Sequence, residues 1–246
     1  MGRVTKLFDR QFYEKFADNW DDKILRESLL EVLDKNSRCL DYGAGRGNVE
    51  QLDFRENVGF IAGVDPDPSV HENPFLHDAK VLCLQSQLID YPDEDFDVVF
   101  SDNVLEHIED PDRVFQEINR VLKPNGVFIA KTPNAMHYMP LIARNTPHWF
   151  HVAYNRMRGR ATVDTFPTRY KANSKKRIEG LASMHGFVVE EIQLIEGRPE
   201  YLRLSWPTYL IGIAYERTVN AFEFLANCRC VLLLRLRKEA ALDRNR

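Results

Sequence analysis

The sequence has few cysteines and no long apolar run. Its 246 residues include only four cysteines, and no two have the C-x-x-C spacing of a zinc site or of a small disulfide scaffold. The cysteines are Cys39, Cys83, Cys228 and Cys230. We therefore expect four reduced thiols in the core of a cytoplasmic protein. The best candidate for a membrane span, Tyr209–Tyr215, ends at charged residues and is far shorter than the roughly 18 residues required. Met1–Lys6 is polar and charged, so we expect no secretory signal peptide.

The charged residues are unevenly distributed. The whole chain carries 33 basic and 37 acidic residues, whereas residues 1–130 carry 14 and 27, and residues 131–246 carry 19 and 10. The simpler interpretation is two solvated surfaces of opposite sign. The alternative is that the basic half faces an anionic substrate, a lipid headgroup or a nucleic acid. Charge alone leaves both interpretations open.

Short apolar runs alternate with longer amphipathic segments along the chain. The runs predict seven strands, at Arg38–Tyr42, Phe60–Val64, Lys80–Leu84, Phe96–Ser101, Val127–Lys131, Phe187–Leu194 and Val231–Leu236. The amphipathic segments predict helices at Ile24–Leu33, Pro111–Leu122, Ser174–Met184 and Pro207–Leu225. This alternation indicates an α/β fold, a doubly wound, Rossmann-like, mostly parallel sheet of seven strands whose last two strands can lie antiparallel at one edge.

We expect one domain over residues 1–246, with two additions to the sheet. Residues 1–37 would form an N-terminal helical cap. Residues 133–171, which are rich in aromatic residues, histidine and arginine, would form an insertion or substrate lid after the fifth strand.

A glycine-rich turn follows the first predicted strand. Asp41 precedes Gly43-Ala44-Gly45-Arg46-Gly47, and glycine lets a ligand approach the backbone closely. We expect a helix after the turn, with its N-terminus next to the ligand. The next strand is followed by Asp65, where an acid can accept both hydroxyls of a ribose. The turn and Asp65 together predict a nucleoside-binding crevice.

The glycine spacing also indicates what kind of nucleoside binds. Dinucleotide folds use G-x-G-x-x-G to seat a pyrophosphate, which this turn lacks. Asp41 beside the turn would repel a phosphate but suits an ammonium group.

Further motifs follow in order along residues 38–131. The segments are Leu40–Gly47, Gly63–Asp65, Phe96–His107 and Val121–Gly126. In these segments the chain resembles the class I S-adenosylmethionine-dependent methyltransferases, and it is most similar to their small-molecule, quinone-biosynthesis-like branch (methyltransferase type 11). The resemblance implies S-adenosylmethionine as cofactor and S-adenosylhomocysteine as product.

The resemblance also implies roles for the matching positions. Asp41 and the glycine-rich turn would hold the methionyl end of the cofactor, Asp65 would hold the ribose, and Ser101–Leu105 would close over the sulfonium. Relatives often carry an Asp near the adenine after the third strand, where this chain has Gln85-Ser86-Gln87-Leu88. The cofactor-binding residues expected on this basis are Asp41, Gly43, Ala44, Gly45, Gly47, Asp65, Pro66, Gln85, Ser86, Ser101 and Asn103.

Methyl transfer to a hydroxyl needs a base, and histidine titrates near neutral pH. His107 lies just past the fourth strand, at the edge where ligands bind in such sheets, so it is our candidate catalytic base. The alternative is that Leu105-Glu106-His107 only caps a packed turn, and His137, His148 and His151 are rivals. No further ligand set follows His148-x-x-His151, so we expect no metal.

The predicted insertion interleaves aromatic and basic side chains. The aromatics would either line a lid over the acceptor or pack in a core, and arginine suits the capture of phosphate or carboxylate. The aromatic residues are Tyr138, Trp149, Phe150, Tyr154, Phe166 and Tyr170, and the basic residues are Arg144, Arg156, Arg158, Arg160, Arg169 and Lys171. We expect methylation of an oxygen or nitrogen of a small acceptor that is a saccharide, lipid-linked or otherwise anionic.

Two other functions fit parts of the sequence. An RNA methyltransferase, acting for example on tRNA, would use the basic carboxyl-terminal half, but the acidic half disfavours a nucleic-acid partner. A non-catalytic cofactor-binding module would have little reason to keep the full set of acids and glycines. A peripheral membrane contact through Pro207–Leu225 fits its aromatic and leucine-rich face, although core burial explains that face more simply. The sequence does not determine the oligomeric state.

Overall fold

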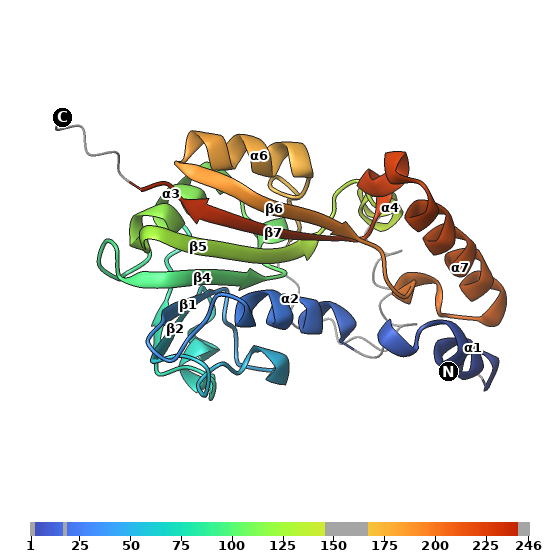
Figure 1. The fold of residues 1–246 in the computed structure, drawn as a ribbon, viewed down its shortest axis with the longest axis horizontal. Helices are drawn as coiled ribbons and strands as arrows, with labels where there is room; N and C mark the ends of the chain where they lie inside the picture. Colours follow the sequence, from blue (N-terminus) through green and yellow to red (C-terminus); the bar gives the residue numbers. More distant parts are fainter. Residues whose placement is uncertain (1–2, 17–18, 146–166, 241–246) are drawn as a thin grey trace.

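The computed structural model describes residues 3–16, 19–145 and 167–240. In this part of the chain, seven strands form one sheet in the order β3-β2-β1-β4-β5-β7-β6 (Figure 1). Neighbouring strands are parallel except at β7, which is antiparallel to both β5 and β6. The predicted seven-stranded, mostly parallel sheet is therefore confirmed. The strands are β1 (Arg38–Tyr42), β2 (Phe60–Asp65), β3 (Asp78–Val81), β4 (Phe96–Asp102), β5 (Leu122–Pro133), β6 (Phe187–Ile195) and β7 (Val231–Lys238).

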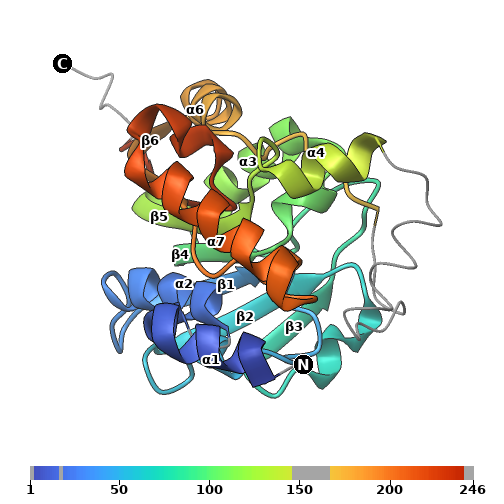
Figure 2. The same ribbon diagram turned by 90° about the vertical axis from the view of Figure 1, so that its right-hand side faces the viewer.

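The described helices cover the two faces of the sheet and one of its ends. Helices α3 and α6 lie on one face and α2 on the other (Figure 1). Helices α1, α4 and α7 lie beyond the carboxyl ends of the parallel strands, and Figure 2 views the molecule from that end. The helices are α1 (Arg3–Phe12), α2 (Trp20–Leu30), α3 (Pro111–Val121), α4 (Tyr138–Asn145), α6 (Lys175–Met184) and α7 (Trp206–Ala221).

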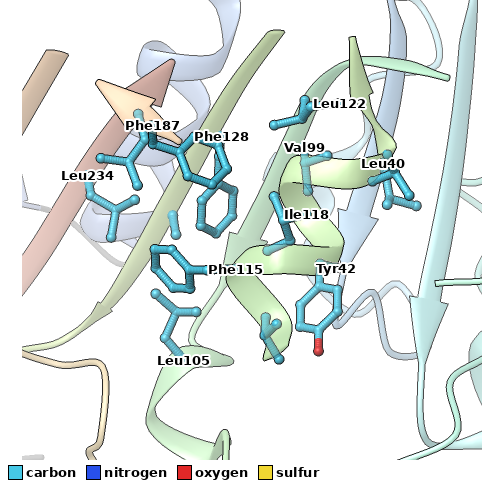
Figure 3. Close-up of a cluster of buried hydrophobic side chains, with 14 of the residues drawn as sticks. Leu40, Tyr42, Val99, Leu105, Phe115, Ile118, Leu122, Phe128, Phe187 and Leu234 are labelled. Carbon is cyan, nitrogen blue, oxygen red and sulfur yellow. The ribbon is translucent and has the colours of Figure 1, made fainter. Parts of the chain in front are cut away.

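Two apolar clusters hold the layers together. In the first, Phe115 of α3 packs edge-on against Phe128 of β5 and Phe187 of β6, with ring centroids 5.7 and 6.3 Å apart (Figure 3). In the second, Leu25 and Leu29 of α2 are buried against the opposite face. Because both faces are covered, the inner strands are apolar on both sides, as parallel strands require.

The crossovers between β1, β2 and β3 differ from the sequence prediction. In the fully described segment 43–59, the turn is followed by a 3-10 helix at Glu50–Leu52 (η2) and by no α-helix. Within the turn, Gly43, Gly45 and Gly47 have φ angles of 90°, 50° and 74°, in the left-handed region that a right-handed helix excludes. The expected helix N-terminus beside the ligand is therefore wrong.

Several other predictions shift or fail. β3 begins two residues before the predicted Lys80–Leu84 and ends at Val81, because the chain turns back where the Gln87 N–H donates to the Cys83 carbonyl. α7 ends at Ala221 and is followed by a 3-10 helix at Glu223–Cys228 (η6). All four cysteines are free, but only Cys39 is buried, and Cys83 is exposed.

Residues 1–37, predicted as a helical cap, contain α1, a 3-10 helix at Glu14–Phe16 (η1) and α2. α4 and residues 167–171 belong to the predicted insertion, whose residues 146–166 lie outside the described residues. The insertion therefore stays a prediction as a substrate lid. Within the described residues, no helix combines the length and apolarity that crossing a bilayer requires.

Candidate active site

Two adjoining cavities lie at the carboxyl ends of β1, β2 and β4. The larger, of about 490 Å³, extends from Asp65 to His107. The smaller, of about 190 Å³, lies along the turn after β1. Gly43 and Asp102 line both cavities, so the two spaces meet there. Of the predicted cofactor-binding residues, Gly43, Asp65, Pro66 and Asn103 line the larger cavity, and Asp41, Gly43, Ala44, Gly45 and Gly47 line the smaller one.

The backbone of the glycine-rich turn is held from two sides. The Gly43 N–H donates to the Val64 carbonyl at 2.8 Å, and the Asn73 Nδ2 donates to the carbonyls of Ala44 and Gly45 at 2.9 and 3.3 Å. A Cβ on Gly43 would collide with the Val104 side chain, and its φ of 90° disfavours any side chain. The turn is therefore a rigid part of the cavity wall, and a ligand can approach its backbone closely.

Asp65 joins the turn to the end of β2. Its Oδ2 accepts from the Gly45 N–H at 3.0 Å and its Oδ1 from the Asp67 N–H at 2.8 Å. The carboxylate is buried, and this burial raises its pKa above the ordinary range. Because a carboxylate has about four acceptor positions, it can still accept hydroxyl groups from the cavity.

Asp41 and Asp102 add two more carboxylates between the cavities. Burial raises the pKa of Asp41 well above its ordinary value, and the neighbouring Asp102 and Asp65 raise it further. Burial also raises the pKa of Asp102 to about 6, although the Lys131 ammonium lies 2.9 Å from its Oδ1. This group of acids is costly to ionise without a cation.

Lys131 is the buried cation of this region. Its side chain is 1% exposed and contacts Asp102 of β4 and both Asp21 and Asp22 of α2. Burial alone would lower the pKa of Lys131, but the three carboxylates raise it above its ordinary value. Lys131 therefore joins the start of α2 to the cavity wall.

The buried acids outnumber Lys131, which bears on the expected cofactor. Asp41, Asp65 and Asp102 line the cavities, while Lys131 lies behind Asp102 with its charge also shared with Asp21 and Asp22. An ammonium or sulfonium group would offset the excess negative charge, whereas a phosphate would add to it. The residues present therefore fit S-adenosylmethionine.

The cavity wall that follows β3 contains other residues than those singled out as cofactor-binding from the sequence. Gln85 and Ser86 do not line this cavity, and Leu82, Leu84 and Gln87 do. Gln87 has a φ of 52°, and its amide donates to the Leu84 carbonyl and accepts from the Tyr42 hydroxyl, both at 2.9 Å. The early end of β3 and this turn bring Gln87 to the wall.

Ser101 lies in β4 and Asn103 comes directly after the strand, and their positions relative to the cavities differ. Asn103 lines the larger cavity with a φ of 53°, and its N–H donates to the Lys131 carbonyl at 2.8 Å. Ser101 lines neither of the two cavities; its buried Oγ makes no hydrogen bond with any described residue. Its predicted contact with the cofactor is thus not supported by its position.

His107 lies in a 3-10 helix at Leu105–His107 (η4) and lines the larger cavity. Its Nδ1 lies 3.3 Å from the Pro167 carbonyl, and its Nε2 lies 3.9 Å from the Glu106 Oε1. An Nδ1–H donated to that carbonyl would leave Nε2 with a lone pair. The imidazole can then accept a proton in the cavity.

Glu106 holds this turn in place through hydrogen bonds of its side chain and its backbone. Burial raises its pKa to about 7, and the Thr132 hydroxyl donates to its Oε2 at 2.9 Å. Its backbone carbonyl accepts from the N–H groups of Arg169 and Tyr170. The turn that carries His107 is therefore tied to residues 169–170 and is packed through Glu106, and the role of His107 as the base stays a prediction.

Of the rival histidines, the structure describes His137. It is buried directly before α4, 3.7 Å from Glu196, and lines neither cavity. His148 and His151 lie outside the described residues, as do Trp149, Phe150, Tyr154, Arg156, Arg158, Arg160, Phe166 and the side chain of Arg144.

Among the described basic residues of the insertion, Arg169 lines the larger cavity, together with Glu109 and His107. The Arg169 Nε lies 2.8 Å from the Glu109 Oε2. Lys171 also contacts Glu109 but does not itself line the cavity.

Sequence reasoning missed Lys131, and it included Asp102 and Gln87 only within the segments Ser101–Leu105 and Gln85–Leu88 without singling them out. A lysine at the end of an otherwise apolar strand was the one available signal, because lysine is rarely buried without a partner. Its partners on α2 are more than 100 residues away in the chain.

Comparison with known proteins gives one family. A family model described as a methyltransferase domain matches residues 11–192. The sterol 4-C-methyltransferase of Caenorhabditis elegans is 35% identical over 105 residues, which cover 39% of this chain and 31% of that protein. The malonyl-(acyl-carrier protein) O-methyltransferase of a Marinomonas species is 29% identical over 140 residues, which cover 53% of this chain and 51% of that protein. The chain thus spans about a third to a half of the length of these relatives.

A solved structure extends the likeness to nearly the whole chain. An S-adenosylmethionine dependent methyltransferase from Mesorhizobium loti superposes with a TM-score of 0.55 and 17% sequence identity, covering 91% of this chain and 99% of that one. At this identity the likeness shows a shared fold.

Proposed function

The chain belongs to the methyltransferase domain family, and from this premise we propose that it transfers the methyl group of S-adenosylmethionine to an oxygen or nitrogen of a small, anionic acceptor. The observation that carries the proposal is the meeting of two cavities at Gly43 and Asp102. One is bordered by the open turn and its acids, and the other by His107 and Arg169.

Different residues of the chain would bind different parts of the cofactor. Asp41 and the glycine-rich turn would hold the methionyl end, and Asp65 the ribose hydroxyls. Leu82, Leu84 and Gln87 would border the adenine. When bound, S-adenosylmethionine supplies a methyl group on a sulfonium, which is a strong electrophile, so positioning of the acceptor can supply much of the rate.

His107 would act on the acceptor. With Nδ1 held by the Pro167 carbonyl, Nε2 would accept the proton of an acceptor hydroxyl or amine. Arg169 and Lys171 would attract an anionic group on the acceptor, since arginine binds phosphate and carboxylate through paired hydrogen bonds. The acceptors after which two relatives are named, a sterol and a protein-bound malonyl group, support a small-molecule acceptor without identifying it.

Calorimetric titration of the purified protein with S-adenosylmethionine and S-adenosylhomocysteine tests the cofactor. We expect heat of binding for both ligands. Folded protein that binds neither would exclude the proposal.

The acceptor can be found with a labelled methyl group. The protein is incubated with methyl-labelled S-adenosylmethionine and either a small-molecule extract or bulk tRNA, and label is followed by mass spectrometry. We expect label in a small anionic compound. Label in tRNA would favour the RNA methyltransferase, and cofactor binding without any transfer would favour a non-catalytic module.

The role of His107 is tested once the acceptor is known. We expect His107→Ala to lower kcat by about 10²- to 10⁴-fold, the usual contribution of a general base, with little change in cofactor affinity. His71→Ala is the matched control, because His71 is exposed and lines neither cavity. Equal turnover in the two variants would remove His107 as the base.

A further inference from the structure

One face of α7 exposes large apolar side chains. Trp206, Leu210 and Ile211 are 55%, 44% and 64% exposed. At 100° per residue they lie on the side of the helix opposite to the buried Tyr209 and Gly212. The sequence interpretation that Pro207–Leu225 buries its apolar face in the core is therefore wrong for Leu210 and Ile211.

α1 lies beside the start of α7 (Figures 1 and 2). The ring centroids of Phe8 and Tyr209 are 6.0 Å apart, and the Tyr209 hydroxyl donates to the Asp9 Oδ1 at 2.6 Å. On its outer side, α1 exposes Val4 and Leu7, by 44% and 58%. We call the exposed apolar residues Val4, Leu7, Trp206, Leu210 and Ile211 the end surface.

In α1 and α7, the acidic side chains face inward and the exposed charged side chains are basic. The acids Asp9 and Glu216 face inward and accept hydrogen bonds from Tyr209 and Tyr13. The exposed charges among the described side chains of α1 and α7 are Lys6, Arg10 and Arg217, and all are cationic. The end surface therefore combines apolar side chains with positive charge.

We propose that the end surface docks on a lipid bilayer with anionic headgroups. Apolar side chains gain free energy by entering the acyl boundary, tryptophan suits the interface, and cations bind the anionic headgroups. The same end of the molecule carries the carboxyl ends of the parallel strands, where the cavities lie. Docking would thus bring the candidate active site close to a lipid surface.

Charge favours a bilayer over a second copy of the chain. A two-fold symmetric dimer through this surface would bring the same patch of both copies together, and so would face Lys6, Arg10 and Arg217 with their equivalents. Like charges close together are unfavourable. An anionic bilayer instead pairs every one of these cations.

Vesicle flotation of the full chain tests the proposal. Vesicles of phosphatidylcholine with phosphatidylglycerol are compared with vesicles of phosphatidylcholine alone, at low and high salt. We expect binding to the anionic vesicles that weakens with salt. No binding of the wild type to anionic vesicles would overturn the proposal.

Variants identify the surface. We expect Ile211→Glu to weaken vesicle binding by about tenfold or more, because it removes an apolar side chain that would be buried in the bilayer on docking. Lys6→Gln and Arg10→Gln should each weaken it by about fivefold. Met184→Glu on α6 is the matched control, since Met184 is equally exposed at 64%. Thermal melts of all variants show whether each is folded.

Equal vesicle binding by Ile211→Glu and Met184→Glu would also overturn the proposal. Sedimentation of the wild type and of Ile211→Glu tests the other occupant: self-association that only Ile211→Glu abolishes, without vesicle binding, would assign the surface to a second copy. Flotation needs neither cofactor nor acceptor, so its failure is distinguishable from a failure of the proposed methyl transfer.

Discussion

At the scale of single residues, Asp65 shows how one side chain can serve both fold and ligand. Its two oxygens accept the Gly45 and Asp67 N–H groups, which fixes the turn after β1 against the end of β2. The remaining lone pairs face a cavity. Loss of this carboxylate would therefore affect both the turn and the ribose contact that we propose.

We predict that Asp65→Ala weakens S-adenosylmethionine binding by about 1 to 3 kcal/mol, the cost of leaving buried hydrogen-bonding groups without partners. Calorimetry measures this change. Asp93→Ala, whose carboxylate is 74% exposed, is the control and should bind as the wild type does. Wild-type affinity in Asp65→Ala would show that Asp65 does not contact the cofactor.

At the scale of elements, α2 is attached to the sheet in two ways. Leu25 and Leu29 bury its apolar side against the sheet. Asp21 and Asp22, in its first turn, bind Lys131 of β5, where acids also suit the positive end of the helix dipole. Because Lys131 also contacts Asp102, the position of α2 is connected to the wall between the two cavities.

We predict that Lys131→Met lowers the free energy of unfolding by about 3 to 5 kcal/mol, because it leaves buried carboxylates without their cation. Urea denaturation measures the loss, which should be smaller near pH 5 than near pH 8, since the carboxylates can then take up protons. Lys123→Met is the control. Lys123 pairs with Asp97 and is 37% exposed, so its loss should cost about 1 kcal/mol or less. An equal cost for both variants would contradict this account of Lys131.

At the scale of the whole molecule, a buried pair connects distant parts of the chain. Glu196 follows β6, accepts from the Cys230 N–H before β7, and lies 3.7 Å from His137 before α4. Burial raises the pKa of Glu196 to about 8, with Glu216 of α7 adding to the rise and Arg229 opposing it. Burial lowers the pKa of His137 to about 4. Both groups are therefore neutral near pH 6.

The pair makes global stability depend on pH in two windows. Between pH 4.5 and about 8, the unfolded chain loses the Glu196 proton that the folded chain keeps, so stability falls as the pH rises. Between pH 6.5 and about 4, the unfolded chain protonates His137 and the folded chain does not, so stability falls as the pH falls.

We predict that Glu196→Gln gains stability relative to the wild type on going from about pH 5.5 to about pH 8.5, by roughly 2 to 3 kcal/mol. The glutamine keeps an acceptor for the Cys230 N–H and has no proton to lose. Urea denaturation at the two pH values measures the difference. A difference between variant and wild type that does not change with pH would show that Glu196 is not protonated in the folded chain.

The sequence by itself determined the local parts of this protein. The alternation of apolar and amphipathic segments predicted the seven strands, and the spacing of Asp41, the glycines and Asp65 placed an acid and an open turn at neighbouring strand ends. Such patterns are predictable because they depend on residues close together in the chain.

Only the tertiary structure decided which side chains face the cavities and the solvent. The glycine-rich turn was followed by a 3-10 helix and not by the predicted α-helix, and the turn after β3 put Gln87 rather than Gln85 or Ser86 at the cavity wall. Lys131 met Asp21 and Asp22 from a distant helix, and Ile211 stayed exposed on an apolar helix. The physical reason is that burial and ion pairing depend on which distant segments pack together, and no local pattern contains that information.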